Sequence, residues 1–273
     1  MRTEDYPPQE PFSEAAQGYH DEVTGRPAPE PDAEVLYGDD PYQGISVFHA
    51  AEPDGRLLAF MHGGGWTNGY KEWMAFMAPA LTAAGVTFAS VGYRLAPRHV
   101  FPVGFEDSCR GLAWLYRHAR DHGADPGRIF VGGHSAGGHY AALMAVRRDW
   151  QEALELPRDA IRGCLPISGV YILTEGSGLP MRPRFLGPDG NEEQASPIHN
   201  IQGPPPPFLI AHGDQDFPHL RTQAEAMEDA LGQAGGDVER LVLGDCNHFS
   251  ASYVAGDAEG PWLGRADVWM AAR

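Results

Sequence analysis

RIFVGGHSAGGHYAALMAV, residues 128–146, joins a short apolar run to a longer apolar segment through a glycine-rich turn. The run favours a strand, and residues 136–149 favour a helix packed on a sheet. The turn, GHSAG at 133–137, fits the pattern Gly-x-Ser-x-Gly. A serine on such a turn exposes its hydroxyl above the sheet, and glycine neighbours are needed because side chains there would collide with the strand and the helix. The stretch predicts that Ser135 is a nucleophile; a phosphate loop is disfavoured because no lysine follows.

A serine hydroxyl is a weak nucleophile, so it requires a histidine base and a carboxylate to orient that base. After an elbow of this kind the acid precedes the histidine in the chain. His248, in GDCNHFS behind the last predicted strand, is the candidate base. Asp216, at the carboxyl end of the preceding predicted strand, is the candidate acid, with Asp214 as its alternative; both acids could instead only cap the next helix. The other candidate histidines are His199, His212 and His219.

HGGGW, residues 62–66, also stands at the end of a predicted strand. Acyl transfer needs backbone amides that stabilise the oxyanion of the tetrahedral intermediate, and glycine lets such amides approach the substrate without a Cβ in the way. We predict that Gly63 and Gly64 supply two of these amides and that Ala136, next to the nucleophile, supplies the third. The competing interpretation is a flexible turn.

Strand and helix patterns alternate from residue 45 onward, which predicts an α/β fold with a mostly parallel, doubly wound sheet flanked by helices. The predicted helices are 71–84, 105–122, 136–149 and 219–234. The predicted strands are 45–49, 57–62, 87–93, 128–134, 163–169, 208–213 and 239–244.

Two segments depart from this alternation. Residues 1–40 are rich in Pro, Glu and Asp without periodicity, and we interpret them as an irregular N-terminal arm before one domain at 41–273. Residues 171–207 are long for a connection and full of turn formers, so they are expected to be a lid or binding-loop insertion, with a surface loop as the alternative.

The chain has 273 residues, 42% of them hydrophobic, and a formal net charge of −17, which argues against nucleic acid or anionic membranes as partners. Its three cysteines are too few and too scattered for a disulfide framework. Without an apolar leader or a long apolar run, a cytoplasmic location is expected. No close pair of histidines suggests a metal site, so neither a metal nor a cofactor is expected.

These motifs resemble the α/β-hydrolase superfamily, and within it the hormone-sensitive-lipase-like esterases and the kynurenine formamidase branch, over residues from about 35 to 250. GYRLAPRHVFP (92–102) is similar to a segment of both groups, whereas HGGGW is similar to the formamidase oxyanion motif. GHSAGGH is also nearer the formamidase form, since the lipase-like form usually has Asp where this chain has His134. DFPHLRTQ (216–223) and NHFS likewise resemble formamidase segments and support Asp216 and His248.

The resemblance implies an α/β-hydrolase fold and hydrolysis of a small-molecule ester or N-aryl formamide without metal or cofactor. We therefore predict a serine hydrolase of the carboxylesterase type, with an arylformamidase as the alternative and a non-catalytic, ligand-binding pseudo-hydrolase as a further one. Trp66, His134 and Phe185 are the candidate pocket residues, although aromatic residues near strand ends also serve as core. A homodimer is left open.

Overall fold

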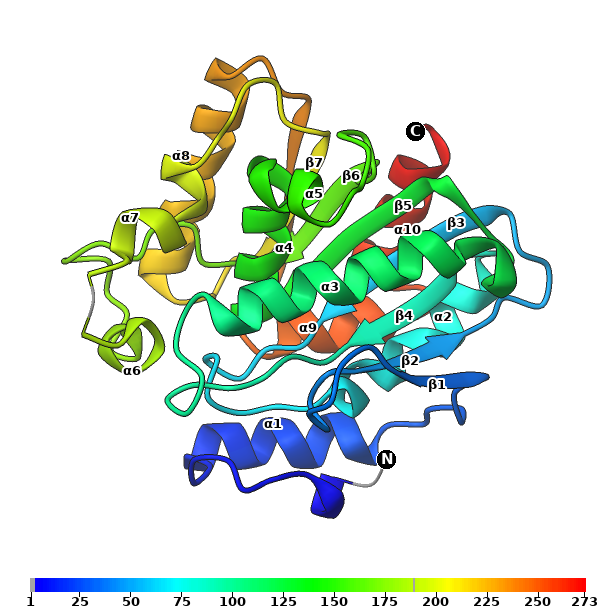
Figure 1. Cartoon of the computed structure of the whole chain (residues 1–273), viewed down its shortest axis with the longest axis horizontal. Helices are drawn as coiled ribbons and strands as arrows, with labels where there is room; N and C mark the ends of the chain where they lie inside the picture. The colour runs from blue at the N-terminus through cyan, green and yellow to red at the C-terminus, as the bar shows by residue number, and fades with distance from the viewer. Residues whose placement is uncertain (1–2, 189) are drawn as a thin grey trace.

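The computed structural model describes residues 3–188 and 190–273, which build one eight-stranded sheet in the order β1-β2-β4-β3-β5-β6-β7-β8 (Figure 1). β2 runs antiparallel to both β1 and β4, and the remaining neighbours are parallel. All seven predicted strands and the mostly parallel sheet are confirmed. The strands are β1 (Ala33–Leu36), β2 (Gly44–Phe48), β3 (Gly55–Met61), β4 (Thr87–Val91), β5 (Ala124–His134), β6 (Gly163–Ile167), β7 (Phe208–Gly213) and β8 (Val238–Leu243).

Helices cover both faces of the sheet, with α3 and α4 on one face and α2, α9 and α10 on the other (Figure 1). The α-helices are α1 (Glu14–Gly25), α2 (Ala78–Ala83), α3 (Val103–His118), α4 (Ala136–Val146), α5 (Asp149–Ala153), α6 (Arg182–Leu186), α7 (Glu192–Ala195), α8 (Pro218–Gln233), α9 (Ser250–Tyr253) and α10 (Pro261–Ala271). The 3-10 turns are η1 (Thr3–Asp5), η2 (Lys71–Met77), η3 (Ala119–His122), η4 (Pro197–His199) and η5 (Val254–Gly256).

The central strands are apolar throughout because both of their faces are covered. In β3, Leu57, Ala59 and Met61 join the apolar layer beneath α3 and α4, whereas Leu58 and Phe60 join the layer beneath α2 and α10. Every one of these five side chains is fully buried. The sheet therefore separates two apolar cores. The loops at the carboxyl ends of its parallel strands are the place where functional residues are expected.

The prediction of an irregular arm over residues 1–40 is wrong for the segments 14–25 and 33–36. Residues Glu14–Gly25 form α1, whose first turn is capped by the Ser13 hydroxyl, and Ala33–Leu36 form the edge strand β1. Tyr19 and Val23 are buried on the face of α1 that packs against η2. Since β1 is hydrogen-bonded to β2, the sheet begins before residue 41, where we expected the domain to start.

The insertion at 171–207 contains α6, α7 and η4 among its described residues. Phe185 and Ala195 of these helices are buried in the main core. The insertion is thus anchored to the body at these points, while its residues Gly178–Met181 line a cavity.

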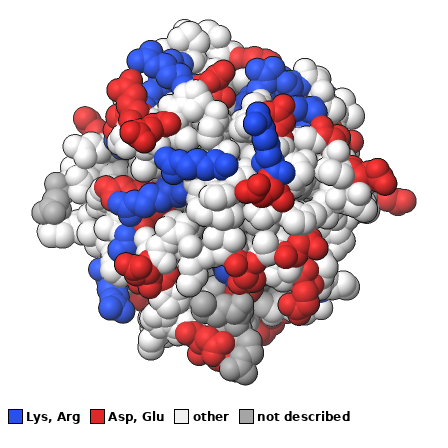
Figure 2. All heavy atoms as spheres, turned by 45° about the vertical axis from the view of Figure 1, so that its right-hand side comes forward, with Lys and Arg blue, Asp and Glu red and all other residues white. Residues whose placement is uncertain are grey.

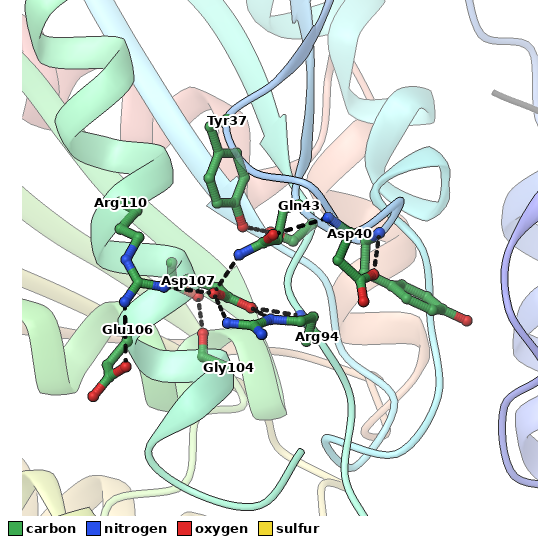
Figure 3. A network of polar contacts seen from close by, with 11 residues as sticks. Tyr37, Asp40, Gln43, Arg94, Gly104, Glu106, Asp107 and Arg110 are labelled. Atoms are coloured by element: carbon green, nitrogen blue, oxygen red, sulfur yellow. Dashed lines mark hydrogen bonds and ion pairs between the residues drawn. The ribbon is translucent and has the colours of Figure 1, made fainter. Parts of the chain in front are cut away.

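Asp107 of α3 is fully buried and ties the loop before β2 to the segment after β4 (Figure 3). Its carboxylate accepts hydrogen bonds from Arg94 (2.7 and 2.8 Å) and from the side-chain amide of Gln43 (2.8 Å). Arg110 adds a third cationic contact at 3.2 Å. A buried carboxylate requires such pairing, so this network joins the first turns of α3 to the loop before β2 and to the segment after β4.

Charged side chains of both signs are interspersed on the face shown in Figure 2. Among the helices of the described residues, none combines the length and the apolar character that a membrane span requires.

Candidate active site

Ser135 lies between the end of β5 and the start of α4 with φ 54° and ψ −115°, a conformation that non-glycine residues rarely adopt. The two glycines of the motif are sterically required. A Cβ on Gly133 would lie 2.3 Å from the carbonyl of Gly137, and a Cβ on Gly137 would lie 2.1 Å from the carbonyl oxygen of Met61. The sequence pattern therefore produces a strained turn that presents a half-buried serine at the carboxyl edge of the sheet.

The structure brings Ser135, His248 and Asp216 together from the ends of three different strands. His248 Nε2 lies 3.0 Å from Ser135 Oγ, and His248 Nδ1 lies 2.9 Å from Asp216 Oδ1. Asp216 Oδ1 also accepts a hydrogen bond of 2.7 Å from the Phe217 amide. With Nδ1 protonated toward the carboxylate, Nε2 is free to accept the serine proton.

Burial raises the pKa of the Asp216 carboxyl, but the hydrogen bond from His248, the electrostatic attraction of that ring and the hydrogen bond from the Phe217 amide outweigh burial. The net result is a pKa below the ordinary value. Asp216 is thus a carboxylate wherever the protein is folded at neutral pH, as the orientation of His248 requires.

The alternative candidates stand elsewhere. Asp214 accepts a hydrogen bond from the Cys246 amide at 3.2 Å, and His212 bonds the carbonyl of Gly213 at 2.9 Å. His199 ends η4, and His219 stacks on Phe217 at the cavity wall. In the described part of the chain, no three His, Cys, Asp or Glu side chains gather as metal ligands.

The glycine run 63–65 leaves β3 and folds into a tight loop beside Ser135. A Cβ on Gly63 would lie 3.4 Å from Ser135 Cβ and 2.9 Å from His134 Nδ1, so this backbone approaches the serine closely. Gly64 has φ +109° and lines the cavity together with Gly65. Ala136 is buried at the start of α4. Sequence reasoning did not single out Gly65, and the oxyanion roles of Gly63, Gly64 and Ala136 stay predictions.

A cavity of about 490 Å³ opens over Ser135. It lies between α1 on one side and the insertion and the start of α8 on another, and none of the described residues that line it is Asp, Glu, Lys or Arg. The wall comprises Ser13, Ala15, Ala16, Tyr19, Gly64, Gly65, Trp66, Thr67, Asn68, Trp73, His134, Ser135, Val170, Gly178, Leu179, Pro180, Met181, Phe217, His219, Leu220, His248 and Phe249. Such a site suits an uncharged, largely apolar ligand.

Two of the three candidate pocket residues, Trp66 and His134, line this cavity. Phe185 does not; it lies behind Trp66 with stacked rings 4.2 Å apart, because the insertion turns its side chain into the core. Trp66 is itself only 2% exposed and donates its indole N–H to His139 (3.1 Å). Trp66 therefore acts both as pocket wall and as core.

His134 supports the loop of the candidate base. Its Nε2 donates to the backbone carbonyl of His248 at 2.9 Å, and its ring stacks on Tyr19 of α1 at 5.6 Å. Burial, together with the nearby His248, lowers the pKa of His134 to about 3, so this side chain is neutral. The wall residues of α1, including Tyr19, were missed because nothing in their local sequence indicates a distant partner.

A family model described as alpha/beta hydrolase fold matches residues 58–251. The chain is an alpha/beta hydrolase. Among curated relatives, this alpha/beta hydrolase is similar to Esterase LipQ of Mycobacterium tuberculosis, with 31% identity over 66% of the chain and 46% of the relative. It is also similar to Esterase LipC of the same organism, with 32% identity over 72% of the chain and 54% of the relative. The chain thus spans about half the length of these relatives.

Among solved structures, the apo form of Thermogutta terrifontis esterase 2 superposes with a TM-score of 0.75 at 22% identity, covering 91% of this chain and 96% of that one. A further structure of that esterase is phosphonylated by cyclosarin. This likeness establishes the fold. The named relatives are esterases and give no support to the arylformamidase alternative.

Proposed function

We propose that the chain is a serine carboxylesterase. The observation that carries the proposal is the continuous hydrogen-bonded chain from Ser135 Oγ through both ring nitrogens of His248 to the Asp216 carboxylate. These hydrogen-bonded residues face a cavity whose described lining residues include no Asp, Glu, Lys or Arg, and the family contains esterases.

In the proposed reaction, Ser135 Oγ attacks the ester carbonyl carbon while His248 Nε2 takes the hydroxyl proton. The amides of Gly63, Gly64 and Ala136 bind the oxyanion. His248 then gives the proton to the leaving alkoxide, the C–O bond breaks, and an acyl-Ser135 remains. Water, deprotonated by His248, then attacks the acyl carbon. The bond from this carbon to Ser135 Oγ breaks, His248 returns the proton to the serine oxygen, and the carboxylic acid leaves. Asp216 stays ionised and stabilises the imidazolium that forms in each half-reaction.

The cavity wall favours uncharged esters over a formamide such as N-formylkynurenine. That substrate carries an amino acid group with both a positive and a negative charge, and burying it away from water requires charged partners. In the part of the wall that the structure describes, there are three histidines and no Asp, Glu, Lys or Arg. An ester with an apolar acyl group and an apolar alcohol matches this wall better than N-formylkynurenine does.

A panel of p-nitrophenyl esters from acetate to octanoate, measured beside N-formylkynurenine, tests the proposal. We expect ester turnover by the wild type and its loss in Ser135→Ala. Ser177→Ala serves as the control, because Ser177 belongs to the insertion but lies outside the cavity wall. A fluorophosphonate probe should label Ser135 in the wild type, by analogy with the phosphonylated esterase. Turnover that survives in Ser135→Ala would exclude this mechanism, and faster turnover of the formamide would favour the arylformamidase alternative.

A further inference from the structure

The N-terminal segment before α1 contacts the glycine loop, residues 63–69, through the side chain of Gln9. The amide of this side chain pairs with a backbone N–H and a backbone carbonyl, as a neighbouring strand would. Gln9 donates its amide N–H to the carbonyl oxygen of Gly69 (2.8 Å) and accepts from the Gly69 amide (2.9 Å). One side chain therefore satisfies both polar groups of one residue's backbone. Next to this pair, the Asn68 side chain donates to the carbonyl of Glu10 (2.7 Å).

Gly69 closes the loop that contains the oxyanion glycines. A Cβ on Gly69 would lie 2.3 Å from His62 Nδ1 and 2.7 Å from the carbonyl oxygen of Gly63, so the end of the loop rests against its beginning. A Cβ on Gly64 would likewise lie 2.1 Å from the Asn68 carbonyl oxygen. Because these residues are in close contact, a movement of Gly69 would also move the backbone of Gly63 and Gly64.

Inside the loop, few hydrogen bonds hold this geometry. The Gly64 carbonyl accepts from the amides of Thr67 (3.2 Å) and Asn68 (3.0 Å), and His62 Nδ1 bonds the Gly63 carbonyl (2.7 Å). Gly64, Gly65 and Gly69 all have positive φ, and glycine has more conformational freedom to lose than any other residue. The two hydrogen bonds from Gln9 to Gly69 therefore restrict the backbone conformations of a loop whose glycines could adopt many.

We propose that Gln9 is a positioning residue of the active site, which sets the Gly63 and Gly64 amides by clamping Gly69. This inference rests on the proposed esterase function. Gln9 itself is absent from the cavity wall, so it acts through the loop and not on the substrate. The segment that looked like an irregular arm in the sequence is then part of the catalytic apparatus.

Three variants test the proposal with p-nitrophenyl butyrate. Gln9→Met keeps the side-chain length and removes both hydrogen bonds, whereas Gln9→Glu keeps the acceptor for the Gly69 amide and loses the donor. Gln17→Met is the matched control, because the Gln17 side chain is exposed on α1 and its described hydrogen bond is to Asp21. We expect kcat to fall about 10- to 100-fold in Gln9→Met with KM nearly unchanged, to fall less in Gln9→Glu, and to stay at the wild-type value in Gln17→Met.

A second measurement separates loop positioning from general loosening of the fold. A butyl trifluoromethyl ketone forms a tetrahedral adduct on the serine, and its inhibition constant should rise in Gln9→Met by the factor by which kcat/KM falls. Assays are run below the thermal midpoint of each variant, which circular dichroism measures. Two results would overturn the role of Gln9 and leave the proposed esterase function standing. One is a kcat of Gln9→Met equal to that of Gln17→Met, and the other is a lower kcat with an unchanged inhibition constant. A wild type without Ser135-dependent ester turnover would overturn the proposed function together with this inference.

Discussion

Gly137 faces the carbonyl oxygens of Met61 and His62 at distances that leave no room for a side chain. In Gly137→Ala the new Cβ would lie 2.1 Å from the first oxygen, so α4 and β3 must move apart. We expect a loss of about 3 kcal/mol in the free energy of unfolding, measured by urea denaturation. Gly264→Ala is the control, since a Cβ there meets nothing within 4 Å in the middle of α10. It should stabilise the protein by about 0.5 kcal/mol, and equal effects of the two variants would contradict the steric argument.

The proposed role of Asp216, which is to orient His248, can be tested without a change in the protonation of Asp216 across the assay range. Its pKa lies below the ordinary value, so it remains a carboxylate throughout the pH range of esterase assays. Asp216→Asn removes the charge and disfavours the His248 tautomer that accepts the serine proton. We expect kcat to fall about 10⁴-fold at every pH from about 5 to about 9. A profile that is only shifted along the pH axis, with full activity recovered at one end, would refute this role.

At the scale of elements, α1 narrows the cavity. Ala16 lines the wall, whereas its neighbour Gln17 is exposed. Ala16→Phe should fill part of the space and raise the preference for acetate over octanoate esters at least about tenfold, because longer acyl chains lose their room. Gln17→Phe places the same ring on the solvent side and should leave the ratio unchanged. Chain-length profiles of kcat/KM for both variants decide this, and an unaltered profile in Ala16→Phe would remove α1 from the acyl site.

The local sequence pattern was sufficient to predict the strands that are buried on both faces, because these strands are apolar runs. It was also sufficient to predict the motif segments that follow them. It failed for β1, whose four residues alternate between half-buried and exposed at the sheet edge. It also failed for α10, which no motif precedes, although Trp262 and Trp269 bury the helix deeply. Ser135, His248 and Asp216 could be named as candidates because the roles proposed for them demand particular residue types in a particular order. Gln9, Tyr19 and Phe185 could not be placed, because their contacts join segments about 60 or more residues apart.

At the scale of the whole molecule, three buried histidines couple the fold to pH. Burial is the largest cause that lowers the pKa of His62 and His139 to about 4 and of His134 to about 3, from an ordinary value of 6.5. Between these values and 6.5 the unfolded chain binds protons that the folded chain excludes. The free energy of unfolding therefore falls as the pH drops below 6.5, by about 1 kcal/mol per pH unit for each histidine. Carboxylates with lowered pKa values, such as Asp216 and Asp149, add to the loss only at lower pH.

His139 offers the cleanest test of this coupling. It accepts from Trp66 and donates to the carbonyl of Ala195 at 2.6 Å, and a glutamine has one acceptor and one donor for the same two partners. His139→Gln should therefore fold at pH 7, and its slope of unfolding free energy against pH between about 5 and 6 should be smaller than that of the wild type by about 1 kcal/mol per pH unit. His118→Gln, at an exposed position, should keep the full slope. Urea denaturation series at several pH values give the slopes; if His139→Gln retained the wild-type slope, acid sensitivity would have to arise from groups other than the buried histidines.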